Sequence, residues 1–137
     1  MTELTVGQVV AERTIPLTRD SLVRYAGASG DFNPIHYRDD VAASVGLPGV
    51  LAHGMLTMGA AVQAVVDWAG GAARVRDYQV RFTRPVVVDP ETGAELEVTA
   101  KVGALDEEAG TARIDLTVRS AGQTVLGKAQ VVVVTAA

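Results

Sequence analysis

The stretch SGDFNPIHYRDD, residues 29–40, holds the side chains with the clearest chemical potential in the sequence. It brings Asp31, Asn33 and His36 close together along the chain, and His36 is one of only 2 histidines. An imidazole titrates near neutrality and a carboxylate can orient it or share its proton, so Asp31 and His36 have the parts of a general acid and base. We predict that they form a catalytic pair, with Asn33 as a hydrogen-bonding support.

This pair requires a bend in the chain. Five extended residues span about 16 to 18 Å, which would keep Asp31 and His36 apart. Pro34 and the neighbouring glycines favour a turn, and Pro34 drives Asn33 toward an extended conformation. The alternative is that Asp31 and Asn33 bond only their own backbone in a turn and that His36 is an ordinary, satisfied side chain.

The second histidine, His53, precedes Gly54 at the predicted start of an apolar helix. Helix starts carry unpaired backbone N–H groups, so the Gly54 N–H could hold a carbonyl oxygen as negative charge develops on it. The alternative is that Gly54 is merely the helix start. Two histidines and a carboxylate can also bind iron, but His36 and His53 lack the spacing of paired ligands on one element, so we expect no metal.

An acid–base pair with one oxyanion site, and without a metal, nucleophile or phosphate loop, suits the addition or removal of water beside a thioester. A base takes a proton from the water that attacks C3 of an enoyl group. The thioester oxygen becomes enolate-like, and an acid protonates C2. The reverse reaction is a dehydration.

Two periodicities predict the elements that position these residues. Residues 54–69 are apolar nearly all round and are followed by two glycines, which predicts a helix enclosed by protein. From residue 73 the pattern changes to period two, which predicts strands over residues 74–88, 94–105, 111–120 and 124–134. One helix followed by long antiparallel strands implies an α+β layer fold.

The first third of the chain is predicted to hold shorter elements. A strand covers residues 8–15 and ends at Pro16. Thr18 caps a short helix with Asp20 in its first turn, and this helix ends near Gly27. A brief helix, capped by Asp39 or Asp40, is expected to run through residue 44.

Length and composition restrict the class of protein. The 137 residues suit one domain over residues 1–137, and 48% hydrophobic with 20% charged residues is typical of a folded chain. The net charge of -4 disfavours nucleic acid. The most apolar region is interrupted by Pro48, His53 and Gln63, so no membrane span is expected. The absence of cysteine and of a signal-like N-terminus favours a cytoplasmic protein.

Beyond these patterns, the segment YAGASGDFNPIHYRDDVAA, residues 25–43, resembles the signature of the MaoC-like, or R-specific enoyl hydratase, family. Serine, glycine, aspartate, asparagine, proline and histidine all fall in register. The similarity continues through GLPGVLAHGMLTMG and VRDYQVRFTRPV, so it covers most of the chain. Within the family it is most similar to the catalytic subunit of actinobacterial (3R)-hydroxyacyl-ACP dehydratases.

The resemblance implies a single hot-dog fold, in which an antiparallel sheet wraps one long helix. It implies a cofactor-free lyase that interconverts (3R)-3-hydroxyacyl and trans-2-enoyl thioesters in fatty-acid or polyketide metabolism. Asp31 and His36 would be its catalytic pair, Asn33 their support, and the Gly54 N–H the oxyanion donor.

The acyl tunnel of such an enzyme would run along the long helix. The possible substrate contacts are His53, Met55, Met58, Gly59 and Val62. Methionine and valine at helical spacing are, however, more often core residues. Four arginines could meet the phosphates of a carrier, although alternating charges on a strand usually form a solvated face; they are Arg74, Arg76, Arg81 and Arg84.

A second subunit is also implied, because hot-dog chains pair two sheets into one. Edge strands of a sheet are usually paired or covered, which favours the same conclusion. Both a homodimer and a heterodimer stay open, as do CoA and acyl carrier protein as the substrate's carrier. Two alternative functions are a non-catalytic subunit that binds the acyl chain and a hot-dog thioesterase.

Overall fold

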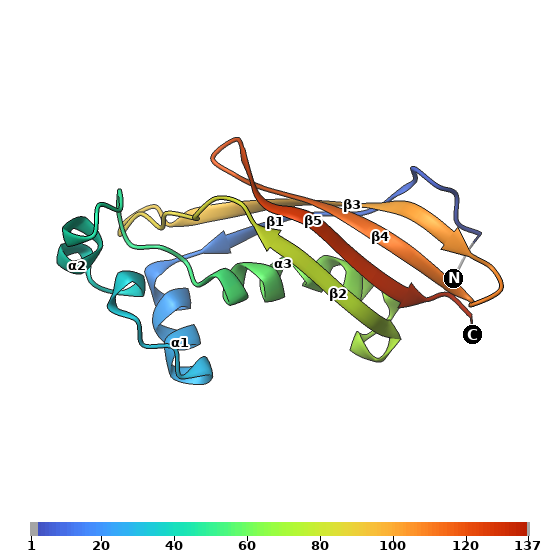
Figure 1. The fold of residues 1–137 in the computed structure, drawn as a ribbon, viewed down its shortest axis with the longest axis horizontal. Helices are drawn as coiled ribbons and strands as arrows, with labels where there is room; N and C mark the ends of the chain where they lie inside the picture. The colour runs from blue at the N-terminus through green and yellow to red at the C-terminus, as the bar shows by residue number, and fades with distance from the viewer. Residues whose placement is uncertain (1–2, 137) are drawn as a thin grey trace.

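The structure, a computed structural model, describes residues 3–136; the predicted domain also includes residues 1, 2 and 137, which lie outside this range. A five-stranded antiparallel sheet lies over one long helix, α3 (Gly54–Ala69), and both chain ends lie at the same end of the elongated molecule (Figure 1). Helices α1 (Arg19–Ser29) and α2 (Asp39–Ser44) lie at the opposite end. This is the predicted α+β layer arrangement, and the bounds of the long helix are as predicted.

The sheet has the strand order β1-β3-β4-β5-β2, with every neighbouring pair antiparallel. Its two edges are therefore β1 and β2. The strands are β1 (Val9–Leu17), β2 (Val75–Phe82), β3 (Ala94–Asp106), β4 (Thr111–Ser120) and β5 (Gln123–Val134). The other helical segments are α1 (Arg19–Ser29), η1 (Pro34–His36), α2 (Asp39–Ser44) and η2 (Ala72–Arg74).

The core lies between α3 and the concave face of the sheet. Alternate residues of the three central strands are buried there, as expected for a sheet with one covered face. On α3, Ala61, Ala64 and Val65 are buried against them. The Tyr78 hydroxyl of β2 donates a 2.7 Å hydrogen bond to the Met58 carbonyl of α3, and burial raises the pKa of Tyr78 to about 12. The small buried side chains of α3, such as Ala61 and Ala64, let the sheet pack close to the helix.

The predicted end of the first strand at Pro16 is wrong. Strand β1 continues to Leu17, and Pro16 pairs with Glu95 of β3. Proline cannot donate to a ladder, but β1 is an edge strand with a partner on one side only. An edge position therefore accommodates Pro16 inside the strand.

Two predicted helix boundaries also differ from the structure. Thr18 caps α1 as expected, but α1 continues past Gly27 to Ser29, and Gly30 forms its left-handed C-cap with φ 77°. Of the two glycines, only the one at position 30 adopts the conformation that terminates a helix. Helix α2 ends at Ser44 as predicted, but its N-cap is Arg38, so Asp39 and Asp40 occupy its first turn.

The strand predicted over residues 74–88 divides into a strand and a loop. Strand β2 stops at Phe82, and the following residues leave the sheet. They pair instead with the segment before α3: the Ala52 N–H donates to Val86, and the Val88 N–H donates to Val50, each at 2.9 Å. This loop forms one wall of the candidate site.

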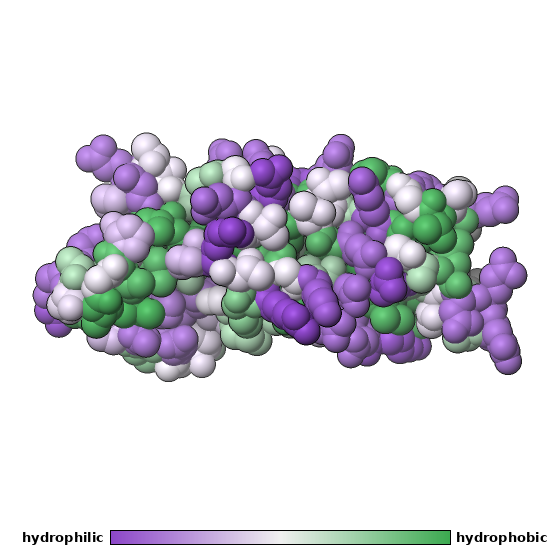
Figure 2. Space-filling model, turned by 45° about the horizontal axis from the view of Figure 1, so that its top comes forward, coloured by the Kyte–Doolittle hydropathy of each residue, from purple (hydrophilic) through white to green (hydrophobic). Residues whose placement is uncertain are grey.

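One face of α3 is open in the single chain. Met55 is 59% exposed near the helix start, and Phe82 is 56% exposed on the neighbouring edge strand. The prediction that α3 is enclosed on all sides therefore holds only toward the sheet. Figure 2 shows hydrophobic residues gathered toward both ends of the molecule, with hydrophilic side chains across the middle of the face in view. Among residues 3–136, no helix combines the length and hydrophobicity needed to cross a bilayer.

Candidate active site

Arg19 ties together the elements that surround the site. Its guanidinium binds Asp39 at the start of α2 through two hydrogen bonds, of 2.9 and 3.2 Å, and its Nε donates to the Val88 carbonyl at 2.7 Å. The hydrogen bonds from Arg19 lower the pKa of Asp39 below its ordinary value. Arg19 of α1 thus holds both α2 and the 83–88 loop in place. These elements flank the turn over residues 30–38.

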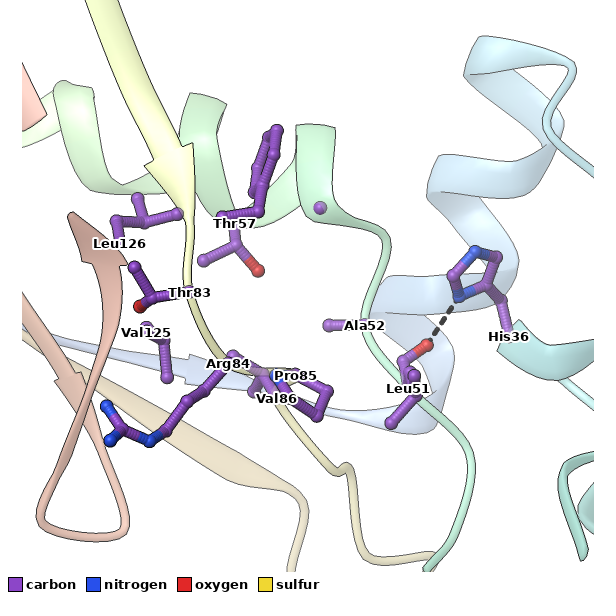
Figure 3. A pocket seen from close by; sticks show the side chains of 12 residues that line it. His36, Leu51, Ala52, Thr57, Thr83, Arg84, Pro85, Val86, Val125 and Leu126 are labelled. Atoms are coloured by element: carbon purple, nitrogen blue, oxygen red, sulfur yellow. Dashed lines mark hydrogen bonds between the residues drawn. The ribbon is translucent and has the colours of Figure 1, made fainter. Parts of the chain in front are cut away.

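The predicted bend is present and holds His36. The Asn33 side chain caps the 3-10 helix η1 by accepting from the Ile35 N–H at 3.2 Å. His36 at the end of η1 is only 8% exposed, and its Nδ1 lies 2.7 Å from the Leu51 carbonyl oxygen (Figure 3). A carbonyl only accepts, so Nδ1 carries the hydrogen and Nε2 carries the lone pair in the neutral ring.

The turn also brings Asp31 to the free side of His36. Asp31 Oδ2 lies 4.0 Å from His36 Nε2, and Asp31 Oδ1 accepts from the Asn33 N–H at 3.2 Å. The Asp31 side chain is half exposed. The distance of 4.0 Å is too long for a direct hydrogen bond but allows a water molecule to bond both groups. Asn33 meets Asp31 through its backbone, while its side chain serves the turn.

His53 lies directly against this pair. Its ring centre is 3.8 Å from that of His36 with the planes inclined by 22°, and its other neighbour is Tyr25, in an edge contact at 4.7 Å. His53 Nε2 lies 3.2 Å from the Asp31 carbonyl oxygen, so Nε2 is the donor. Burial lowers the pKa of His53, and within residues 3–136 its Nδ1 is buried without a hydrogen-bond partner.

Asp31, His36 and His53 offer ligand atoms within 4.8 Å of one another, so the metal alternative can be examined on geometry. Imidazole lone pairs lie in the ring plane. Because the two rings are stacked almost parallel, an ion between them would lie well outside both planes. The stacked arrangement therefore does not suit a shared metal.

Next to His36 lies a cavity of about 300 Å³ (Figure 3). Its lining consists of His36, Leu51, Ala52, Gly54, Thr57, Phe82, Thr83, Arg84, Pro85, Val86, Val125 and Leu126. Gly54 is the first residue of α3, where backbone N–H groups have no partner within the helix. A Cβ at Gly54 would come within 3.1 Å of the Phe82 ring, so a side chain there would crowd the cavity wall. Asp31 is not part of this lining and is connected to the cavity through His36.

The structure brings some predicted residues together and not others. Asp31, Asn33, His36, His53 and Gly54 gather around the start of α3. His53 is 1% exposed and does not line the cavity. Nor do the predicted tunnel residues Met55, Met58, Gly59 and Val62, which stay a prediction for the assembled protein. Of the four arginines, Arg84 alone lines the cavity.

Sequence reasoning missed two parts of the site. Thr57, which was read only as part of an apolar helix, is buried and faces the cavity. Residues 82–86, which form one wall of the cavity, were predicted to continue the strand over residues 74–88. Each had a signal in the sequence: a hydroxyl three residues after Gly54 in an otherwise apolar helix start, and Pro85, which cannot donate to a sheet.

Comparisons with known proteins connect this geometry to a family. The model of the MaoC like domain matches residues 2–120. A 3-hydroxyacyl-thioester dehydratase X from Mycobacterium tuberculosis is 38% identical over 77 residues, which are 56% of this chain and 26% of that protein. The chain therefore spans about a quarter of the length of this curated relative.

Solved structures agree on the fold. A MaoC-like dehydratase superposes over 98% of this chain and 41% of its own, with a TM-score of 0.95 and 36% identity. The R-hydratase PhaJ1 from Pseudomonas aeruginosa superposes over 98% of this chain and 84% of its own, with a TM-score of 0.76 and 31% identity. The predicted hot-dog fold is thereby confirmed.

Proposed function

Because this chain belongs to the MaoC-like domain family, we propose that it is a hydro-lyase that interconverts (3R)-3-hydroxyacyl thioesters with trans-2-enoyl thioesters and water. The observation that carries this proposal is that Asp31 Oδ2 lies 4.0 Å from Nε2 of His36, which lines the same cavity as the first residue of α3. The pair, the cavity and the helix start correspond to the three needs of the reaction: a proton relay, a substrate site and a charge-stabilising donor.

In the hydration direction, a water molecule bonded to both Asp31 and His36 is the nucleophile. His36 Nε2 has the free lone pair, because Nδ1 donates to the Leu51 carbonyl, and it accepts a proton as the water oxygen bonds to C3. The C2–C3 π electrons move toward the thioester. The pair then returns one proton to C2, so the atoms of water are added without net change in charge.

The Gly54 N–H is the donor for the thioester oxygen. As C3 accepts the nucleophile, electron density reaches this oxygen, and a fixed N–H at a helix start stabilises it without reorganisation. Gly54 has no side chain, and the adjacent Phe82 ring leaves little room for one. Because Gly54 has no Cβ, no side chain of its own shields its N–H from a thioester.

We propose that the substrate is an acyl thioester on CoA or acyl carrier protein, in fatty-acid or polyketide metabolism. Arg84 is the arginine best placed to meet a carrier phosphate, because it lines the cavity, although its Nη1 already donates to the Thr124 carbonyl at 3.1 Å. The open face of α3 and the free edge of β2 favour a dimer with an identical or related hot-dog subunit. Such a dimer would enclose Met55 and the tunnel residues that follow it.

One assay tests the function. Purified protein is mixed with crotonyl-CoA, and the absorbance of the conjugated enoyl thioester and the release of free thiol are followed in parallel. For the wild-type protein we expect loss of conjugation without release of thiol. For Asp31→Asn we expect no loss of conjugation. Thiol release would instead identify a thioesterase. No change in either signal, also after a related subunit is added, would identify a non-catalytic subunit.

A further inference from the structure

Thr57 is a buried polar side chain of the cavity to which the proposed mechanism gives no role. It lies three residues after Gly54 in α3, so both residues face the same side of the helix. Thr57 is 3% exposed and lines the cavity, and Figure 3 shows its side chain pointing into that space. A buried hydroxyl costs free energy unless it is hydrogen-bonded.

Within residues 3–136, the Thr57 hydroxyl takes part in no hydrogen bond. A helical threonine commonly donates to the carbonyl four residues earlier. Here the His53 carbonyl accepts from the backbone N–H of Thr57, at 3.1 Å, and not from its hydroxyl. The hydroxyl oxygen of Thr57 is not fully enclosed by protein. It keeps a small accessible surface, which opens into the cavity. The hydroxyl is therefore free to donate to a bound molecule.

Each of the other polar side chains in the lining already makes a hydrogen bond to a backbone carbonyl, although Arg84 keeps further N–H groups. Thr83 and Arg84 both donate to the Thr124 carbonyl, each at 3.1 Å, and His36 Nδ1 is paired with the Leu51 carbonyl. The Thr57 hydroxyl and the Gly54 N–H are two neighbouring donors on the first turn of α3 that make no hydrogen bond within residues 3–136. Most of the surrounding lining is apolar, which strengthens any hydrogen bond made there.

We propose that the Thr57 hydroxyl is a second oxyanion donor, which holds the thioester carbonyl oxygen together with the Gly54 N–H. This inference rests on the proposed function and adds a catalytic residue to it. When the nucleophile bonds to C3, electron density moves through C2 and C1 to that oxygen, and both donors shorten their bonds to it. No proton is transferred from Thr57, and the density returns when C2 is protonated.

Two neutral donors suit an oxygen whose charge is transient. A permanent carboxylate favours a cationic partner at close range, whereas a thioester oxygen is neutral in the ground state and gains charge only during the reaction. Donors that bind the oxygen more strongly at that moment raise kcat more than they lower KM. The hydroxyl should therefore affect turnover rather than substrate affinity.

Thr57→Val and Thr57→Ser separate the hydroxyl from the methyl group. Valine keeps the shape and loses the donor, while serine keeps the donor and loses the methyl group. With crotonyl-CoA we expect valine to lower kcat by about ten- to a hundredfold with KM changed less than about threefold, and serine to stay within about fivefold of the wild-type kcat. Thermal unfolding supplies a second measurement: valine should leave Tm unchanged or raise it, because it removes a buried hydroxyl without a partner.

Each outcome decides the matter. If the wild-type protein is active and valine keeps its kcat, or if serine loses as much as valine, Thr57 is not an oxyanion donor. If valine lowers Tm by several degrees together with kcat, the hydroxyl has a structural role and the proposal is wrong. If the wild-type protein neither adds nor removes water, the proposed function fails first, and the role of Thr57 fails with it.

Discussion

The imidazole rings of His36 and His53 are stacked, with their centres 3.8 Å apart and their planes inclined by 22°. The second ring also reaches Asp31, because His53 Nε2 donates to the Asp31 carbonyl at 3.2 Å. One buried side chain thus contacts both members of the proposed catalytic pair. Its burial lowers the pKa of His53 below the ordinary 6.5, which disfavours a positive charge on His53 beside His36.

This lowered pKa predicts a pH dependence of stability. As the pH falls below about 6.5, the unfolded chain protonates His53 while the folded protein resists it, so the free energy of unfolding should decrease as the pH falls further. His53→Phe keeps an aromatic ring and removes the titration. Thermal unfolding at several pH values should show a smaller decrease in this variant.

The pH range in which His53 affects stability differs from the range in which the carboxylates do. Hydrogen bonds lower the pKa values of Asp39, Asp40 and Asp89 below the ordinary 3.8, so their contribution is lost only below about pH 4. An unchanged pH dependence in His53→Phe would show that His53 is not the group responsible.

Gly54→Pro should remove the oxyanion donor and leave the fold intact. Position 54 is the first residue of α3, where proline is tolerated, and His53 has φ -58° and ψ 133°, which suits the residue before proline. Turnover should fall by about a hundred- to a thousandfold, the usual effect of losing one oxyanion donor.

Gly54→Ala is the matched control, since alanine keeps the N–H and adds a methyl group 3.1 Å from the Phe82 ring. Its loss of turnover should be smaller than that of proline and should be partly restored by Phe82→Leu. Equal losses in folded proline and alanine variants would mean that Gly54 supplies space and not a hydrogen bond.

Lys128→Gly should stabilise the protein. Lys128 lies in β5 beside a register shift and has φ 43°, a left-handed conformation that disfavours side chains with a Cβ. Glycine should raise the free energy of unfolding by up to about 1 kcal/mol. Lys101→Gly, at an exposed position of β3 without a positive φ, should lower it, and denaturant unfolding of both variants compares the signs. A loss at both positions would contradict this account of Lys128.

The active protein should be at least a dimer. Light scattering at assay concentration should give at least twice the mass of the chain, because the open face of α3 and the edge strand β2 need a partner. Met55→Glu should weaken assembly by placing a charge on that face, whereas Val6→Glu, equally exposed near the N-terminus, should not. A fully active monomer would remove the argument for the dimer.

Most of the fold is local enough to be read from the sequence. Period-two patterns located the four later strands, and the apolar run located α3 with its ends, because each pattern reflects burial of one face or stripe. The errors arose where tertiary position decides. Pro16 fits inside a strand only because β1 is at the edge, and Gly30 rather than Gly27 ends α1 only because of its left-handed backbone.

The approach of Asp31 and His36 was predictable from the sequence, but the walls of the cavity were not. Asp31 and His36 approach each other because the turn at Pro34 bends the chain as expected. No periodicity could show that His53 would stack on His36, because that contact joins segments 17 residues apart. The same holds for the loop after Phe82, whose partner is the segment before α3.

The proposed catalytic pair is tested most directly by a double-mutant cycle on kcat for crotonyl-CoA hydration, with every variant checked for folding by circular dichroism. Asp31→Asn and His36→Ala should each lower kcat by at least about a hundredfold, and the double variant should be little worse than the worse single one, because the two groups act as a unit. A folded single variant with near-normal turnover, or losses that multiply in the double variant, would contradict the assignment of Asp31 and His36 as one acid–base pair.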